Sequence, residues 1–182
     1  YIAYQTAYFK ANYPVEFMTS IFNSSLGQQE RMGTMADECT LLGISVGQPD
    51  VSRSDVEFTI EGDSRTDQAA IRTGLAAVKN VGRAAVEAIA AERRVHGPFT
   101  SMDDFVKRAD LHSLNRRALE SLIKAGAFDA LGPRGGLVDQ AERILSLAQQ
   151  EQKARDSQQG SMFEMMGAAA DASLPSLDLA SA

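Results

Sequence analysis

The sequence predicts a mainly α-helical protein with a small appended β-sheet and a disordered C-terminal tail. Three observations favour this α+β class. Apolar residues recur at helical spacing over most of the first 155 residues, one stretch alternates apolar and polar side chains, and the composition after Arg155 becomes rich in Ser, Gln, Gly and Ala. These patterns are typical of amphipathic helices, of a half-buried strand and of a segment that buries too little apolar surface to fold.

The chain opens with helical spacing in YIAYQTAYFKANYPVEF. Tyr13-Pro14 ends this first helix, because the proline ring disfavours helical geometry at the residue before it. Pro14 suits the first turn of a second helix, which the polar residues 23–25 close. The start has neither a methionine nor an N-cap, so we expect the chain to be a fragment of a longer protein.

A third helix is expected over residues 28–42, and the following SVGQPDVSRSD indicates a loop. The stretch DVEFTIEGD then alternates apolar and polar residues from Val56 to Ile60, which predicts a strand. Residues 69–72 are its candidate partner. A sheet of two or three strands therefore belongs to the first region, residues 1–70.

Two helical patterns meet at a tight turn in TGLAAVKNVGRAAVEAIAAERR, which spans Thr73 to Arg94. This pattern is typical of a helix-hairpin-helix. Free amides and the positive dipole end at the start of the second helix attract a phosphate oxygen. A side chain at Gly82 would hinder both the turn and the approach of a nucleic-acid backbone. The candidate DNA-binding residues of this hairpin are Lys79, Asn80, Val81, Gly82 and Arg83.

The hairpin pattern alone equally fits a structural turn, and the charge distribution favours DNA contact. The net charge of the chain is −6, which argues against a dedicated DNA-binding domain. However, residues 71–134 hold 11 basic and 7 acidic residues, whereas residues 1–70 hold 4 and 10, and residues 135–182 hold 3 and 7. Attraction to a phosphate backbone needs a local cluster of positive charge rather than a global excess.

A second hairpin is expected at residues 110–115. Ser101 and Asp104 form a capping box for a short helix before it, over residues 102–108. A longer helix follows and ends at Ala125-Gly126, with Leu119, Leu122 and Ile123 on one face and Arg117, Ser121 and Lys124 on another. The second hairpin has no glycine, so a packing role is favoured over DNA contact, but Arg116 and Arg117 keep DNA contact open.

The C-terminal part divides into a helix, residues 135–155, and a flexible tail, residues 156–182. A joint at Leu131-Gly132-Pro133-Arg134-Gly135-Gly136 precedes the helix. The tail contains one apolar island, and large apolar residues in such a segment typically enter a partner's groove. Its candidate partner-binding residues are Gln159, Ser161, Met162 and Phe163; a chance Met-Phe pair at a frayed helix end is the alternative.

The composition excludes several classes of protein. No run approaches the roughly 18 to 20 apolar residues of a membrane span, and no signal peptide is visible. The single cysteine, Cys39, cannot form an internal disulfide and suits a helix core face in a reducing, cytoplasmic protein. His96 and His112 have no neighbours at ligand spacing, so no metal site is expected.

Five stretches, in this order, resemble one family. They are AYQTAYFKANYPVEFM, DECTLLGI with PDVSRSDVEFTIEG, IRTGLAAVKNVGRAAVEAIAAER, GPFTSMDDFVKRADLHSLNRRALESLIKAGAFDALG and QGSMF. Together they closely resemble the alpha subunits of bacterial DNA polymerase III, the C-family replicative DNA polymerases. The resemblance covers nearly the whole chain, from Tyr1 to Gly167.

The resemblance implies that each region corresponds to a particular part of the family's structure. Residues 1–70 correspond to the distal fingers region, residues 71–134 to tandem helix-hairpin-helix units that contact duplex DNA, and the tail to a sliding-clamp-binding peptide. Gln159, Ser161, Met162 and Phe163 fall on that peptide. Asn80 departs from the family pattern, because it stands where many such hairpins place their first glycine.

The resemblance also implies an activity and partners. The family synthesises DNA on a template in chromosome replication, and its Mg²⁺ ions are held by palm carboxylates. Those carboxylates are expected upstream of this fragment, so we expect no catalytic residue, no cofactor and no polymerase activity in the fragment alone. The expected partners are duplex DNA, the sliding clamp and other subunits of the polymerase holoenzyme, with no membrane. The alternative is a free-standing helix-hairpin-helix accessory protein of DNA repair or recombination.

Overall fold

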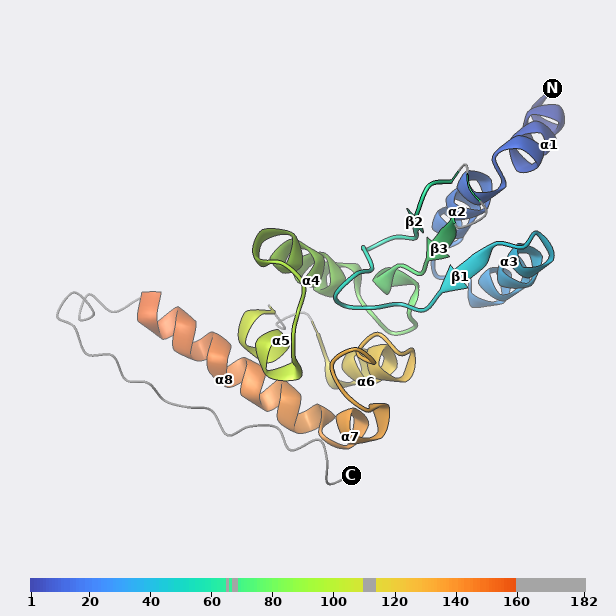
Figure 1. Ribbon diagram of the computed structural model, residues 1–182. Coiled ribbons are helices and arrows are strands. Elements are labelled where there is room, and N and C mark those ends of the chain that lie inside the picture. Colours follow the sequence, from blue (N-terminus) through green and yellow to red (C-terminus); the bar gives the residue numbers. More distant parts are fainter. Residues whose placement is uncertain (65, 67–68, 110–113, 160–182) are drawn as a thin grey trace.

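The computed structural model describes residues 1–64, 66, 69–109 and 114–159. These residues form mostly helices together with one small sheet, which confirms the mainly helical α+β class. The molecule is elongated (Figure 1): the first helices and the sheet lie at one end, and the later helices form the other end. Each end has its own apolar core, so we call them the N-terminal lobe and the C-terminal lobe.

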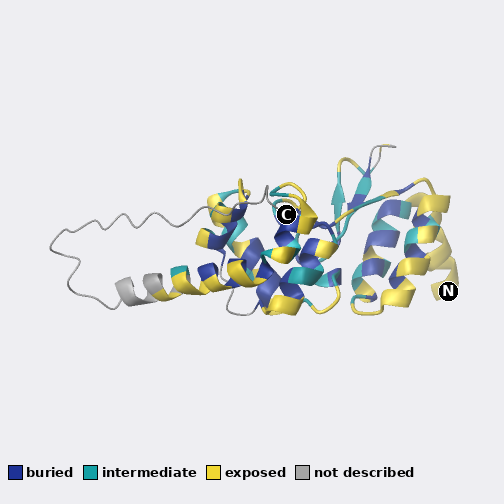
Figure 2. Ribbon diagram, turned by 90° about the horizontal axis from the view of Figure 1, so that it is seen from below, coloured by how far each residue is buried: buried dark blue, intermediate teal, exposed yellow. Residues whose placement is uncertain are grey.

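The N-terminal lobe begins with the helices α1 (Ile2–Asn12), α2 (Pro14–Ser24) and α3 (Gln29–Leu41). Pro14 opens α2 at its first turn, as predicted. Cys39 is fully buried in α3, where desolvation and, to a lesser degree, Glu38 raise the pKa of its thiol to about 11. By contrast, α1 has no buried residue and is exposed along its length (Figure 2).

Three short strands make the sheet of this lobe: β1 (Ser45–Gly47), β2 (Thr59–Glu61) and β3 (Ala70–Arg72). Their order is β1-β3-β2, with β3 parallel to β1 and antiparallel to β2. The strand expected from Val56 begins only at Thr59. The carbonyl of Val56 instead accepts a hydrogen bond from the amide of Ala76, which draws this segment to the C-terminal lobe.

The strand β1 corrects the prediction of a loop over residues 45–55. Three residues are too few to display an alternating pattern, and β1 exists only because it pairs with β3, about 25 residues further along the chain. The expected boundary between residues 70 and 71 falls inside β3. Residues 71 and 72 therefore complete the sheet of the first region.

The C-terminal lobe consists of the single 3₁₀ turn η1 (Leu75–Ala77) and the helices α4 (Arg83–His96), α5 (Met102–Arg108), α6 (Arg116–Lys124), α7 (Arg134–Asp139) and α8 (Ala141–Gln159). Its largest fully buried side chains include Ile89, Phe105, Leu119, Leu122, Phe128 and Ile144. As predicted, Ser101 caps α5, and Leu119, Leu122 and Ile123 form the buried face of α6.

The joint expected at residues 131–136 is helical from Arg134 onward, which corrects that prediction. Pro133 caps α7, and Arg134 pairs with Asp129 at 2.5 Å. The single helix expected over residues 135–155 is divided at Gln140 into α7 and α8. The second of these continues to Gln159, four residues beyond the expected end of the helix at Arg155.

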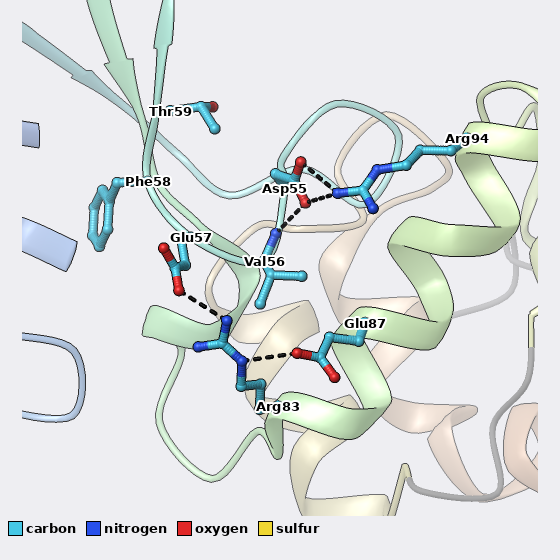
Figure 3. A pocket seen from close by; sticks show the side chains of 8 residues that line it. All are labelled: Asp55, Val56, Glu57, Phe58, Thr59, Arg83, Glu87 and Arg94. Carbon is cyan, nitrogen blue, oxygen red and sulfur yellow. Dashed lines mark hydrogen bonds and ion pairs between the residues drawn. The ribbon is translucent and has the colours of Figure 1, made fainter.

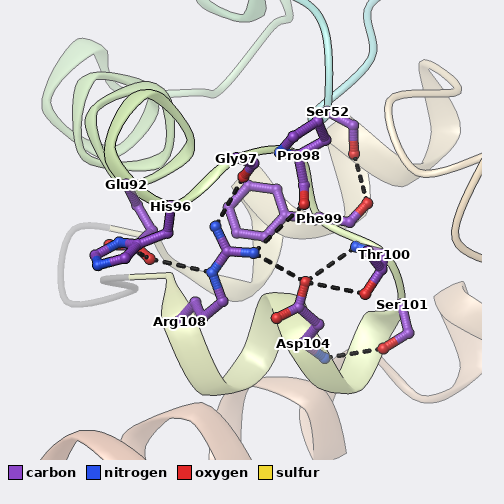
Figure 4. Close-up of polar contacts among 10 residues, drawn as sticks. All are labelled: Ser52, Glu92, His96, Gly97, Pro98, Phe99, Thr100, Ser101, Asp104 and Arg108. Carbon is purple, nitrogen blue, oxygen red and sulfur yellow. Dashed lines mark hydrogen bonds and ion pairs between the residues drawn. The ribbon is translucent and has the colours of Figure 1, made fainter.

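A polar cluster around Arg108 fixes the connection between α4 and α5 (Figure 4). Its guanidinium donates to Glu92 at 3.1 Å, to Asp104 at 3.0 Å and to the carbonyl of Gly97 at 2.8 Å. The same group lies 4.8 Å from the centre of the Phe99 ring, where a cation is attracted to the aromatic face. Because the Arg108 guanidinium makes these three hydrogen bonds and also contacts the Phe99 ring, it holds α5 firmly beside α4.

Two further sets of hydrogen bonds connect the lobes. The Gln29 side-chain amide, at the start of α3, donates to the carbonyl of Ala77 at 3.0 Å. Arg93 of α4 donates to the carbonyls of Val51 and Ser54, at 3.1 and 2.5 Å, in the loop that leads from β1 to β2. Since Gln29 belongs to α3 and Ala77 ends η1, the first of these bonds fixes the position of the hairpin relative to α3.

Candidate nucleic-acid interface

The first hairpin has the predicted location but a different internal geometry. Its first helix is only the turn η1, and α4 begins at Arg83 with Gly82 as N-cap. Gly82 has φ −76°, an angle that any residue adopts, and open space in front of its Cα. The turn therefore does not require a glycine there, which corrects that part of the prediction. Asn80 makes the sharp change of direction instead, with φ 67°.

The amides at the start of α4 have no capping side chain. Gly82 offers no side-chain oxygen, and no described residue supplies one to the first turn. The starts of α5 and α6 differ, because the Ser101 hydroxyl accepts from the amide of Asp104 and the Asn115 side chain accepts from the amide of Ala118. An uncapped helix start with open space before it is suited to an anion.

Asn80 brings α6 beside the hairpin. Its side-chain amide donates to the Ser121 hydroxyl at 3.2 Å, and that hydroxyl donates to the carbonyl of Arg117. A hollow lies between the two elements and is lined by Lys79 and Lys124, among others. The polar face that the sequence assigned to α6 therefore faces the hairpin.

The cations of this surface differ in how far they are neutralised. Lys79 and Arg117 are exposed and form no ion pair with any residue in the described ranges. Lys124 contacts Glu120 at 3.6 Å, a long distance for an ion pair on an exposed helix. Such an exposed pair contributes little to stability, so another anion can easily replace Glu120 at Lys124. The hairpin thus carries positive charge that the protein does not cancel.

Arg83 is held by two carboxylates of its own chain (Figure 3). Its guanidinium pairs with Glu57 at 2.9 Å and with Glu87 at 2.8 Å, and these hydrogen bonds raise the pKa of Arg83. The pocket around it also holds a second pair, Arg94 with Asp55 at 2.7 Å. Arg83 is still 59% exposed, so a phosphate can reach it, but only in exchange for a carboxylate.

Arg116 lies apart from Arg117 although the two are neighbours in sequence. It pairs with Glu120 at 2.7 Å and with Glu142 of α8. Successive helix residues point about 100° apart, so only Arg117 shares the face of Ser121. Arg117 therefore lies on the helix face that carries Ser121, whereas Arg116 is directed to α8.

Some predicted site residues lie outside the described part of the chain. The second hairpin is described only at Leu114, which is buried, and at Asn115, which caps α6. Gln159 is the last residue of α8, and Ser161, Met162 and Phe163 lie outside the described residues.

Sequence reasoning placed Ser121 and Lys124 on the polar face of α6 but left them out of the site. The spacing of Arg117, Ser121 and Lys124, at i, i+4 and i+7, already placed them on one helix face. The hydrogen bond between Ser121 and Asn80 joins residues 41 positions apart in the sequence, so no local pattern could predict it.

Two searches among the described residues concern other classes of function. None of the described helices combines the length and apolar character that a bilayer crossing requires. Within the same ranges, no three His, Cys, Asp or Glu side chains converge as ligands for a metal ion.

Comparison with known proteins identifies a family and a set of relatives. The model of the helix-hairpin-helix motif family matches residues 43–136, more than half of the chain. DNA polymerase III subunit alpha of Neisseria meningitidis serogroup B is 40% identical over 165 residues, which is 91% of this chain and 14% of the relative. The Thermus aquaticus subunit is 44% identical over 147 residues, 81% of this chain and 12% of the relative.

A third relative, DNA polymerase III subunit alpha of Escherichia coli K12, is 36% identical over 166 residues, again 91% of this chain and 14% of the relative. The chain thus spans only about one seventh of the length of these relatives. The family match, residues 43–136, includes the first hairpin with η1 and α4. The chain belongs to the helix-hairpin-helix family, and its homologues over about nine-tenths of its length are alpha subunits of DNA polymerase III.

Proposed function

We propose that this chain grips duplex DNA, without reading its sequence, as part of a replicative DNA polymerase alpha subunit. The first hairpin makes the grip, with the amides of α4 receiving one phosphate and Lys79 attracting its neighbours. Arg117 and Lys124 add charge from α6. Backbone contacts of this kind fix the position of a duplex and carry no sequence information.

The observation that carries the proposal is the contrast among helix starts. α5 and α6 are capped by side chains at their starts, whereas α1, α2, α3, α4 and α7 are not, and among these α4 begins within the hairpin that carries Lys79, which has no ion pair in the described ranges. A hairpin that served only for packing would gain stability from a capping residue in place of Gly82. The open start is consistent with binding of an external anion.

The test is to give α4 the cap that it lacks. In the Gly82→Asp variant, the new carboxylate accepts from the first-turn amides and repels phosphate. We expect the thermal midpoint to stay equal or rise, while affinity for a duplex, measured by fluorescence anisotropy, falls at least tenfold. Gly33→Asp is the matched control, because it adds the same charge at another open position. Equal DNA binding by both variants would overturn the proposal.

Lys79 provides a second, independent measurement. Lys79→Gln removes one phosphate contact, so the slope of log affinity against log salt should become shallower by about 1. Lys107→Gln is the control, since Lys107 is an exposed lysine on α5 without an ion pair in the described ranges. The loss should be similar for duplexes of unrelated sequence.

The tail supplies a proposed tether to the sliding clamp. α8 ends at Gln159, and one residue separates it from the segment of Ser161, Met162 and Phe163. Two adjacent apolar side chains are suited to fill a hydrophobic groove, with micromolar affinity expected for so short a segment. The double substitution Met162→Ala and Phe163→Ala should abolish capture of the purified clamp. Unchanged capture would show that other residues bind it.

We also propose that the chain alone does not synthesise DNA, and that it works in the cytoplasm with other subunits of the polymerase holoenzyme. The palm carboxylates that hold Mg²⁺ in the family that the chain resembles are expected upstream of this chain. The expected result of a primer-extension assay with this chain, magnesium and nucleotides is therefore no extended product. Extension that depends on added magnesium would contradict this proposal.

A further inference from the structure

Lys79 borders two hollows. One is the hollow that it shares with Lys124 and Ser121 of α6. The other lies against the turn that joins α2 to α3 and is lined by Gly27, Gln28, Gln29, Glu30, Arg31 and Lys79. The hairpin therefore meets a basic residue of the C-terminal lobe in one hollow and a basic residue of the N-terminal lobe, Arg31, in the other.

Arg31 is unusual among the arginines of this chain. Most arginines whose side chains are described form ion pairs with carboxylates, as Arg72 does with Glu61 at 2.6 Å. Arg31 is exposed and forms no ion pair with any described residue. Its one hydrogen bond is to the side-chain oxygen of Gln28 at 3.3 Å, a neutral partner. The charge of Arg31 is thus available to a ligand in this hollow.

A hydrogen bond between α3 and η1 fixes the two hollows relative to each other. Gln29 lines both hollows, and its side-chain amide donates to the carbonyl of Ala77, two residues before Lys79. This bond fixes the start of α3 beside the hairpin. The one acidic residue of the second hollow, Glu30, forms no ion pair with a described residue, so neither Arg31 nor Lys79 is neutralised by it.

We infer that the DNA-binding surface continues from the hairpin onto the N-terminal lobe, where Arg31 binds a further phosphate of the same duplex. The inference rests on the proposed grip by the hairpin. Arg31 lies outside the residues 43–136 that match the helix-hairpin-helix family. The surface runs from Lys124 through Lys79 to Arg31, and its ligand is a sugar-phosphate backbone, because each hollow is bordered by basic side chains that no carboxylate of the described residues firmly neutralises.

The experiment measures duplex binding by the full 182-residue chain across a salt series. Arg31→Gln should lower affinity about threefold at moderate salt and reduce the salt slope by about 1, the effect of one phosphate contact. Arg143→Gln is the matched control, since Arg143 is also an exposed helix arginine without an ion pair in the described ranges and lines neither hollow. Thermal unfolding checks that both variants fold.

Three outcomes are distinguishable. If Arg31→Gln and Lys79→Gln each weaken binding and Arg143→Gln does not, the extended surface is supported. If only Lys79→Gln weakens binding, the hairpin grip stands and the role of Arg31 is refuted. If neither changes binding relative to the control, both the grip and its extension fail. Protection of Arg31, but not Arg143, from phenylglyoxal by the duplex should accompany the first outcome.

Discussion

At the scale of single residues, Asn80 shows what the sequence could and could not predict. The hairpin was recognisable, and so was the departure from a glycine at its first turn position. The sequence did not show that Asn80 takes the left-handed conformation itself, at φ 67°, and that its side chain reaches Ser121 of a distant helix. Asn tolerates this region better than other residues with a side chain, which explains how the turn survives without its glycine.

Replacing Asn80 separates its backbone role from its side-chain role. Asn80→Gly and Asn80→Ala both lose the hydrogen bond to Ser121, but only alanine is strained at a positive φ. We therefore expect Asn80→Ala to have the lower free energy of unfolding, by about 1 kcal/mol. Urea denaturation of the two variants measures the difference directly. Equal stability would mean that the turn relaxes to another conformation.

Glu57 competes with DNA for Arg83. A phosphate that binds this guanidinium has to displace Glu57 or Glu87. Glu57→Gln weakens one of these partners, so affinity for a duplex should rise. Asp37→Asn removes the same charge from an exposed position on α3 without an ion pair in the described ranges, and it measures the general effect of charge. A rise no greater than that of Asp37→Asn would exclude Arg83 from the DNA contact.

At the scale of elements, the sequence predicted the features that depend on neighbouring residues. It did not predict those that depend on contacts between segments distant in the sequence. Ser101 before α5 and the apolar spacing of α6 predicted those helices, because caps and periodicity lie within a few residues. The first helix of the hairpin, expected without stated bounds, is only the turn η1. The amides of Leu75 and Ala76 instead donate hydrogen bonds to carbonyls of the segment before β2. These bonds compete with helix formation, and no local sequence pattern reveals them.

Gly74 makes this close approach of η1 possible. A Cβ at this position would lie 2.3 Å from the carbonyl carbon of Glu57, which is backbone and cannot move aside easily. Gly74→Ala should therefore lower the free energy of unfolding by roughly 3 kcal/mol. Gly33→Ala is the matched control in open space on α3, and it should raise stability by about 1 kcal/mol. Denaturant unfolding of both variants provides the comparison; a stable Gly74→Ala variant would contradict the close packing.

At the scale of the whole molecule, the fold class and the first hairpin were predictable, whereas the division into two cores was not. The expected boundary at residue 70 follows a change in charge, but the chain crosses between the cores within the segment that holds Val56 and Phe58. Val56 packs in one core and Phe58 in the other. The DNA-binding surface is similarly composite, since it draws on α3, the hairpin and α6.

Acid should destabilise the whole molecule through its arginine-paired carboxylates. The hydrogen bond from Arg72 lowers the pKa of Glu61 below its ordinary value of 4.5, and the hydrogen bond from Arg94 lowers that of Asp55 below 3.8. A lowered pKa in the folded state contributes stability that is present above the ordinary pKa and lost as pH falls through the folded value. The free energy of unfolding should therefore fall below about pH 4.5. In Glu61→Gln this fall should be shallower; an unchanged slope would mean that other groups govern it.

The central position of β3 has a consequence for the order of events during synthesis. β1 and β2 each pair only with β3 in the described sheet, and β3 is the last of the three to be made. Until Arg72 has left the ribosome, the two earlier strands have no partner, and Val46 and Ile60 have no sheet to join. The N-terminal lobe therefore cannot complete its folding before translation has entered the hairpin region, so the two parts of the DNA-binding surface mature together.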